Sequence, residues 1–479
     1  MNSGLKQKAL TGIFWSLVEK FGNQISQVII GIILARLLTP DDFGLIGMIT
    51  VFFAVGEIFI EGGFRQAYVQ KKEATDIDAS TMFYFNFFSS LIFYLLLYTT
   101  APLIASFYNE PQLILIIKVM GLFIIIRSLS IVQEAKLAKN VDFKKRTKIF
   151  TSAFIVSGIS AVIAAYSNMG VWSLVIQRII NASFVAIALW IFTDKIKLNS
   201  FSLTSLKSMF SFGSWILFQT VLGRFFDNLY QIIIGKFYPA AQVGFYTNAK
   251  RFENASSENI TSAIGSVAFP VFSRFQNDTK KLKKATKQYM ENLLFIILPV
   301  MIILMIVSKP FIIIFLTEKW LPMLPYLRLL CIVGILYPIN AVSSNALWGL
   351  GKSKLNFYYS LVTFTLRIIN VFLMYPLGVS YIIIGEIVLR IVIFILKGIA
   401  MGNLISFGIK EQFLLILKYI VFGLVLIIVG GLLAIQIETQ EIEFVVNIFL
   451  LSGIYLLLNY FLNKEHLMSF LLNFKSLYK

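Results

Sequence analysis

The sequence predicts an all-α integral membrane protein with about fourteen transmembrane helices, arranged as two parallel six-helix lobes and a C-terminal helix pair. Three observations predict this fold. The 479 residues are 58% hydrophobic and only 14% charged, with a mean hydropathy of +0.81, whereas soluble proteins carry about 25% charged residues. Apolar stretches of membrane-spanning length follow one another along the chain. Two phrases of the sequence also recur far downstream.

The apolar stretches define the expected helices. Crossing the hydrocarbon core of a bilayer takes about 20 mostly apolar residues. Six segments of this length occupy the first part of the chain, at 11–38, 42–69, 79–107, 112–138, 147–167 and 170–193. Six more lie at 205–238, 242–273, 286–308, 322–350, 355–376 and 378–401, and a final pair lies at 412–436 and 443–462.

An internal repeat groups these helices into two lobes. The phrase "LARLLTPDDFGLIGM" from Leu34 matches "IGKFYPAAQVGFYTN" from Ile234, so that Gly44 corresponds to Gly244, and "APLIASFYNEP" from Ala101 matches "KPFIIIFLTEK" from Lys309. Two matches in the same order indicate a duplicated six-helix unit, and both copies begin on the same side of the membrane, which makes the repeats parallel. The expected divisions are 1–200, 201–405 and a C-terminal part at 406–479.

The loops alternate between basic and neutral or acidic sequences. Because cytoplasmic loops carry the excess of Lys and Arg, both termini are expected in the cytoplasm. The formal net charge of +18 then reflects membrane topology. A basic loop such as "KKLKKATK" facing anionic lipid accounts for that charge, and no nucleic-acid partner is expected.

The sequence leaves little room for metal or covalent chemistry. Cys331 is the single cysteine and His466 the single histidine, so an internal disulfide, a zinc site and a His-based catalytic triad are all excluded. We expect no metal and no cofactor, apart from coupling to a proton or sodium gradient. The loops on the non-cytoplasmic side are only a few residues long, which disfavours a membrane-embedded polysaccharide polymerase.

Polar residues inside the spans are concentrated on four helices. Such side chains are costly in lipid and normally face a bundle interior or a water-filled cavity. In the first and seventh spans they recur on one helical face, comprising Ser16, Lys20, Asn23 and Gln27, and then Arg224, Asp227, Asn228 and Gln231. The second and eighth spans carry Glu57, Glu61 and Arg65, and then Lys250, Glu253, Asn254, Ser257, Glu258 and Thr261. These four helices are expected to line a solvated central cleft.

Internal ion pairing is an alternative explanation for the same charges. Opposite charges three or four positions apart on a helix neutralise each other, as Glu61 with Arg65 or Arg224 with Asp227 would. Pairing or an interface position is the first interpretation for the remaining buried charges, which are Arg127, Arg178, Arg328, Arg367, Glu386 and Arg390.

Four phrases resemble a known family. They are "GIFWSLVEKFGNQ", "ARLLTPDDFGL", "GGFRQAYVQKK" and "LTEKWLPMLPYLRLL". Together they resemble the Wzx-type polysaccharide flippases, in particular the subgroup similar to the colanic-acid exporter, within the multidrug/oligosaccharidyl-lipid/polysaccharide superfamily that includes MATE transporters. The resemblance covers most of the chain, and its first forty or so residues are the most specific.

The resemblance implies an alternating-access transporter. Such proteins move an undecaprenyl-diphosphate-linked oligosaccharide, the repeat unit of an O-antigen, capsule or exopolysaccharide, from the cytoplasmic to the periplasmic leaflet of a bacterial inner membrane. The implied partners are the lipid-linked oligosaccharide, membrane lipid and other polysaccharide-assembly proteins. A drug or cation antiporter of the same superfamily is the alternative, although its cleft should be acidic.

Position in the spans then suggests roles for the polar residues. Cationic side chains in a low-dielectric cleft can bind a diphosphate, and the candidates are Lys20, Arg65, Arg224, Lys250 and Arg251. Amides can bind a glycan, and the candidates are Asn23, Gln27, Asn228, Gln231 and Asn254. A carboxylate near the middle of the membrane can bind a coupling ion, and the candidates are Glu57, Glu61, Asp227 and Glu258.

Overall fold

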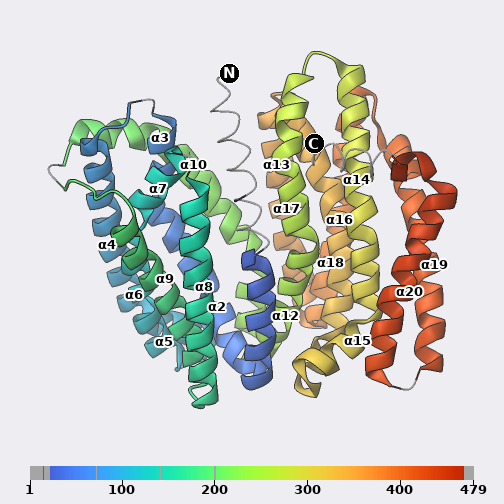
Figure 1. Cartoon of the computed structure of the whole chain (residues 1–479), viewed down its shortest axis with the longest axis horizontal. Coiled ribbons are helices and arrows are strands. Elements are labelled where there is room, and N and C mark those ends of the chain that lie inside the picture. Colours follow the sequence, from blue (N-terminus) through green and yellow to red (C-terminus); the bar gives the residue numbers. More distant parts are fainter. Residues whose placement is uncertain are drawn as a thin grey trace. The chain divides into compact units, whose positions relative to one another are not determined.

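The computed structural model describes residues 15, 22–71, 73–140, 142–198, 201–437 and 439–468. Within these ranges the regular elements are helices, and the chain divides into two compact units, Met1–Gly244 and Phe245–Lys479 (Figure 1). The all-α class predicted from the sequence is confirmed.

The first unit consists of long helices joined by short turns. In chain order it contains a helix over 22–37, then α2 (Pro40–Glu61), α3 (Phe64–Gln70), α4 (Asp76–Tyr108), α5 (Leu113–Met120), α6 (Leu122–Ser128), α7 (Ile131–Lys139), α8 (Phe143–Tyr166), α9 (Trp172–Phe192), α10 (Leu203–Asp227), α11 (Leu229–Phe237) and the start of α12 (Ala240–Glu253). Thr39 starts α2 with a capping box, because its hydroxyl accepts from the backbone of Asp42 while the Asp42 carboxylate accepts from the backbone of Thr39.

The second unit has the same kind of architecture. After α12 it contains the π-helical turn η1 (Asn254–Glu258), α13 (Asn259–Arg274), α14 (Thr279–Ile306), α15 (Ser308–Phe311), η2 (Ile312–Leu316), η3 (Glu318–Met323), α16 (Leu324–Gly349), α17 (Ser353–Met374), η4 (Tyr375–Leu377), α18 (Val379–Ile405), α19 (Ile409–Gln436) and α20 (Gln440–Leu462). The C-terminal pair α19 and α20 packs on α14, as Figure 1 shows at the edge of this unit.

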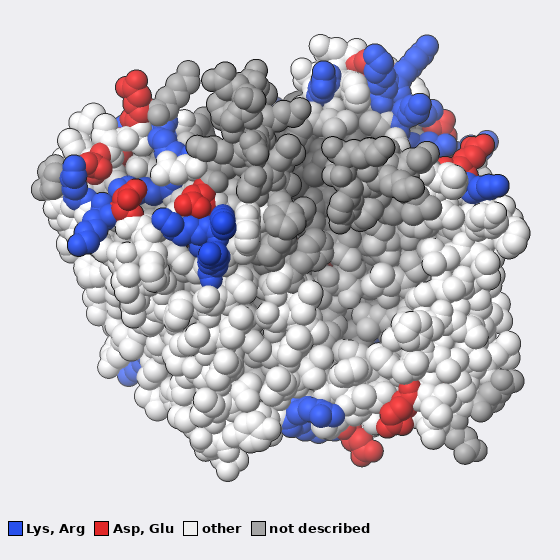
Figure 2. Space-filling model, in the orientation of Figure 1, with Lys and Arg blue, Asp and Glu red and all other residues white. Residues whose placement is uncertain are grey.

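Every segment expected to span the membrane contains helix, but the count of fourteen spans is not confirmed. In the described part of the chain eleven helices are long and apolar enough to cross a membrane. The other three are the first helix, described from residue 22, and the segments 203–237 and 240–274, which carry polar stripes. On the face in Figure 2 charged residues gather towards the two ends of the helices and the band between them is almost uncharged, as a bilayer requires.

The internal repeat is visible in the positions where helices stop. The first helix ends at residue 37 and α2 begins at Pro40, while α11 ends at Phe237 and α12 begins at Ala240. The second pair of matching phrases breaks in the same way, because Asn109 and Thr317 both adopt positive φ angles, 57° and 84°. The two phrases therefore form equivalent turns in both copies of the repeat.

Within the first unit the two matching turns are in backbone contact. A Cβ atom built on Gly44 would lie 1.8 Å from the carbonyl oxygen of Ala240, and one built on Gly244 would lie 2.0 Å from the carbonyl oxygen of Pro40. Only glycine permits such an approach. The contact is reciprocal, since Ala240 is the counterpart of Pro40 in the repeat.

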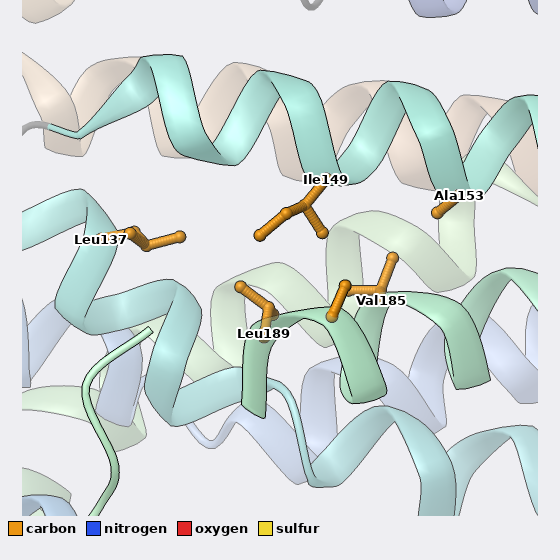
Figure 3. Close-up of a cluster of buried hydrophobic side chains, with 6 residues drawn as sticks. Leu137, Ile149, Ala153, Val185 and Leu189 are labelled. Carbon is orange, nitrogen blue, oxygen red and sulfur yellow. The ribbon is translucent and has the colours of Figure 1, made fainter. Parts of the chain in front are cut away.

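Apolar side chains fill the space between helices. One buried cluster joins α7, α8 and α9 through Leu137, Ile149, Ala153, Val185 and Leu189, which point towards one another in Figure 3. Burying side chains of this size contributes about 1.5–3 kcal/mol for each Val, Leu or Ile in a soluble protein. Between membrane helices the gain comes from close packing instead, and small residues such as Ala153 permit it.

Candidate functional site

A network of four charged residues lies inside the first unit. Glu61 ends α2 and Arg65 lies in α3, separated by Gly62 and Gly63, whose φ angles of 54° and 71° turn the chain between the two helices. Their side chains are 3.9 Å apart. Arg65 also lies 3.8 Å from Glu134 of α7, and Glu134 accepts from Arg127 of α6 at 3.0 Å.

The network balances two cations against two carboxylates. Glu134 is 1% exposed and bridges both arginines, and the Ser130 hydroxyl donates to it at 3.3 Å. A buried carboxylate is tolerated only when it is paired in this way. The pairing of Glu61 with Arg65 considered from the sequence is confirmed, and so is the structural pairing expected for Arg127. Glu57, one turn before Glu61 on α2, is half-buried.

Of the two amide candidates on the first helix, one forms a hydrogen bond within the first unit. Asn23 is half-buried and its Oδ1 accepts from the Thr151 hydroxyl at 3.4 Å. Gln27, one turn further along, is exposed. Lys20 lies outside the described residues.

The seventh expected span breaks at its polar face. Asn228 lies between α10 and α11, and its amide nitrogen donates to the backbone oxygen of Arg224 at 2.8 Å. Arg224 and Asp227 are exposed. The pairing of Arg224 with Asp227 considered from the sequence stays a prediction. Gln231 carries a buried Oε1 that accepts no hydrogen bond from the residues described.

The polar stripe of the eighth expected span contains an irregular turn. Lys250 forms an ion pair with Glu253, which is 0% exposed. The five residues of η1 follow, and π-helical turns of this kind occur frequently at functional sites. The Oδ1 atom of Asn254 is buried there without a hydrogen-bond donor among the described residues. Arg251 and Glu258 are half-buried.

The stripe leads into a cavity of about 850 Å³ within the second unit. Helices α13, α16, α17 and α18 line it, beginning with Thr261 of the stripe and including Asn340, Asn345 and Trp348 of α16. The cationic side chains in its wall are Arg390 and Lys397 of α18, and the lining residues include no carboxylate. Its volume is within the range of about 300–1,000 Å³ usual for ligand sites.

A second buried network lies beside this cavity. Glu386 of α18 is 3.0 Å from Arg367 of α17 and 3.0 Å from Arg390 of its own helix. The structural pairing expected for these three residues is confirmed. One carboxylate here contacts two arginines.

Sequence reasoning missed two of these residues. Glu134 lies seven positions after Arg127, a spacing that places both on one helical face, but its contact with Arg65 joins segments that are distant in sequence. Lys397 lies near the end of an expected span, where long cationic side chains usually reach the interface. The sequence does contain a pattern that could have indicated the cavity. One apolar segment carries a polar or aromatic residue every four positions, at Asn340, Ser344 and Trp348, which places them on one helical face.

The comparison with protein families identifies the chain. The family described as polysaccharide biosynthesis protein matches residues 33–325, more than half of the length. The chain belongs to this family. Relatives in the polysaccharide biosynthesis family include the teichuronic acid biosynthesis protein TuaB of Bacillus subtilis, 25% identical over 74% of this chain and 74% of its own length. The lipopolysaccharide biosynthesis protein WzxC of Escherichia coli is 24% identical over 74% of this chain and 73% of its own.

Solved structures show the same fold in this member of the polysaccharide biosynthesis family. The lipid II flippase MurJ in its inward closed conformation superimposes with a TM-score of 0.74 at 15% identity, covering 95% of this chain and 99% of MurJ. An inward-facing multidrug resistance MATE transporter superimposes with a TM-score of 0.61 at 16% identity, covering 80% and 95%. The MATE-like fold expected from the sequence is confirmed.

Proposed function

We propose that this protein is a flippase for lipid-linked oligosaccharides. It moves an undecaprenyl-diphosphate-linked repeat unit of an O-antigen, capsule or exopolysaccharide from the cytoplasmic to the periplasmic leaflet of the bacterial inner membrane. The family supports a role in polysaccharide biosynthesis, and a relative named as a succinoglycan biosynthesis transport protein, ExoT of Rhizobium meliloti, supports transport. The protein acts by transport without catalysis, next to other polysaccharide-assembly proteins.

The observation that carries this proposal is the charge of the internal cavity. Its wall combines amides, hydroxyls and aromatic rings with Arg390 and Lys397, and the described residues that line it include no carboxylate. A glycan needs the first three kinds of group, and its acidic or diphosphate parts need cations. A site for organic cations would need the opposite charge, so the same observation disfavours the antiporter.

Transfer between leaflets tests the proposal directly. Purified protein reconstituted in liposomes is supplied with a fluorescent undecaprenyl-diphosphate oligosaccharide, and a membrane-impermeant quencher reports how much probe reaches the opposite leaflet. We expect transfer to depend on the protein. Polymer formation without transfer would instead favour an enzyme, and transfer no faster than in empty liposomes would contradict the flippase.

Arg224, the exposed arginine of α10, is our first candidate to bind the diphosphate. Further candidates are Arg65, Lys250, Arg251 and Lys20. Replacing Arg224 by Gln should reduce surface polysaccharide at least tenfold while membrane insertion stays normal, because a charge-assisted hydrogen bond contributes about 1.5–3 kcal/mol. Arg224→Lys should keep part of the activity if charge matters more than fork geometry. Restored export in the double variant with Asp227→Asn would contradict the binding role.

The polar amides remain our candidates for glycan binding, and the carboxylates remain our candidates for ion coupling. Gln231 and Asn254 have buried amide oxygens that lack a donor among the described residues, which supports glycan binding and places them before Asn23, Gln27 and Asn228. Coupling to a proton or sodium ion is assigned to Glu57, Glu61, Asp227 or Glu258.

The orientation in the membrane is a separate prediction. Basic loops should remain in the cytoplasm, so reporter fusions after Lys144 and Lys281 should report a cytoplasmic location and fusions after Asp41 and Glu441 a periplasmic one. Both termini should be cytoplasmic. A cytoplasmic signal from the fusion after Glu441 would overturn this topology.

A further inference from the structure

The wall of the cavity in the second unit offers hydrogen-bond acceptors that lack donors. The Asn340 amide nitrogen donates to the backbone oxygen of Arg390 at 3.1 Å, but its Oδ1 is buried and accepts no hydrogen bond from the residues described. The Thr261 hydroxyl, 2% exposed, is in the same situation. Buried acceptors of this kind are costly unless a ligand satisfies them. A sugar hydroxyl group would reach these two buried oxygens only after the wall moves, whereas Trp348 is 48% exposed and presents a flat apolar surface to a sugar ring.

The cavity also holds a buried cation that lacks a counter-charge. Lys397 is 8% exposed, and its Nζ donates to the Ser344 hydroxyl at 2.7 Å. Among the described residues no carboxylate lies within ion-pair distance of it. A buried ammonium group inside a bundle of membrane helices normally pairs with an acid, so this side chain can attract an anion into the cavity.

The second cation of the wall is already engaged. Arg390 is 3.0 Å from Glu386, which Arg367 also contacts. Among the described residues, Lys397 is therefore the cation of the wall that has no carboxylate partner. One ammonium group matches a singly charged carboxylate, whereas a diphosphate calls for several cations.

We propose that Lys397 binds the carboxylate of an acidic sugar in the glycan. The sugar lies in the cavity with its ring against the exposed face of Trp348. This inference rests on the proposed function, because it assigns the class of glycan that the flippase carries. It places the acidic sugar in the cavity of the second unit.

Binding of soluble probes to the purified full-length protein tests the assignment. The probes are methyl glucuronide, the neutral methyl glucoside and inorganic pyrophosphate, and binding is followed by tryptophan fluorescence with Trp348→Phe as the control for the signal. We expect the glucuronide to bind at least tenfold more tightly than the glucoside. Lys397→Met should remove this preference without weakening the glucoside, and Lys397→Arg should keep most of it.

A matched variant checks that the effect is local. Lys418 of α19 is also half-buried and donates to an amide, Asn463 Oδ1, at 2.7 Å, but it does not line this cavity. Lys418→Met should leave the preference for glucuronide unchanged. Thermal unfolding of each variant shows whether the fold is intact.

The other possible results separate the acidic-sugar site from the proposed function. Equal binding of the two sugars, binding of neither, or a preference that survives in Lys397→Met would overturn the acidic-sugar site. Tighter Lys397-dependent binding of pyrophosphate would assign the cavity to the lipid diphosphate. Selective glucuronide binding by a protein that transfers no lipid-linked glycan in liposomes would support the site and contradict the flippase.

Discussion

Alanine at either glycine of the paired turns should abolish most export. In Gly44→Ala the new Cβ would meet the carbonyl oxygen of Ala240 at 1.8 Å, and in Gly244→Ala that of Pro40 at 2.0 Å. Neither oxygen belongs to a movable side chain, so the turns must separate. Overpacking of this kind costs about 1–3 kcal/mol, which lowers the population of the touching arrangement roughly 5- to 150-fold. If each transport cycle passes through that arrangement, export should fall by a similar factor.

Two measurements test this prediction: the rate of cysteine labelling at the paired turns, and the amount of surface polysaccharide. With Cys331 replaced by Ala, a cysteine at the fully buried Val243 should react slowly with an impermeant maleimide, and Gly44→Ala should make it react rapidly. Gly453→Ala is the matched control, because a Cβ there meets no atom within 4 Å. The double variant should be little worse than either single variant, since both disrupt one contact. Normal export with unchanged labelling in both variants would show that the close approach is dispensable.

The second large effect is expected at Glu134. Glu134→Gln leaves Arg65 and Arg127 near each other without their shared carboxylate, and breaking a buried ion pair costs about 3–5 kcal/mol. Proteins are typically stable by only about 5–15 kcal/mol, so the amount of folded protein in the membrane should fall sharply. Thermal unfolding of the purified protein should show a large decrease in Tm.

Two further variants separate charge balance from other causes. Adding Arg65→Gln to Glu134→Gln removes one uncompensated cation and should recover part of the stability. Glu411→Gln disrupts an exposed pair with Lys283, 2.7 Å apart, and should cost less than about 1 kcal/mol. If Glu134→Gln proves as mild as Glu411→Gln, the network does not hold α3, α6 and α7 together.

The sequence was sufficient for the helices and for the repeat, because both depend on local patterns. Apolar length located the spans, and the phrase around Gly44 and its copy predicted equivalent helix breaks. The reciprocal glycine contact between these turns could not be derived from a pattern within one segment.

The site was harder to predict because its partners come from distant segments. The spacing predicted that Arg65 pairs with Glu61, but it could not show that Glu134, far along the chain, also contacts Arg65. The spacing of Arg224 and Asp227 predicted a continuous polar face, yet the helix breaks at Asn228 directly after them. Lys397 was overlooked because proximity to a span end normally means access to water, and burial by neighbouring helices cannot be read from one span.

The reciprocal contact of Gly44 with Ala240 and of Gly244 with Pro40 has the pattern of a symmetric homodimer interface, in which residue i touches j and j touches i. Although the two copies are joined in one chain, their sequences are not free to diverge at these two glycines. A bulkier residue at either glycine would clash with the backbone of the other copy. A smaller side chain in that copy could not relieve the clash, because the atom in the way belongs to the main chain. Sequence drift between the halves is therefore unequal along their length: elsewhere each half can change alone, but at this crossing the two copies constrain each other.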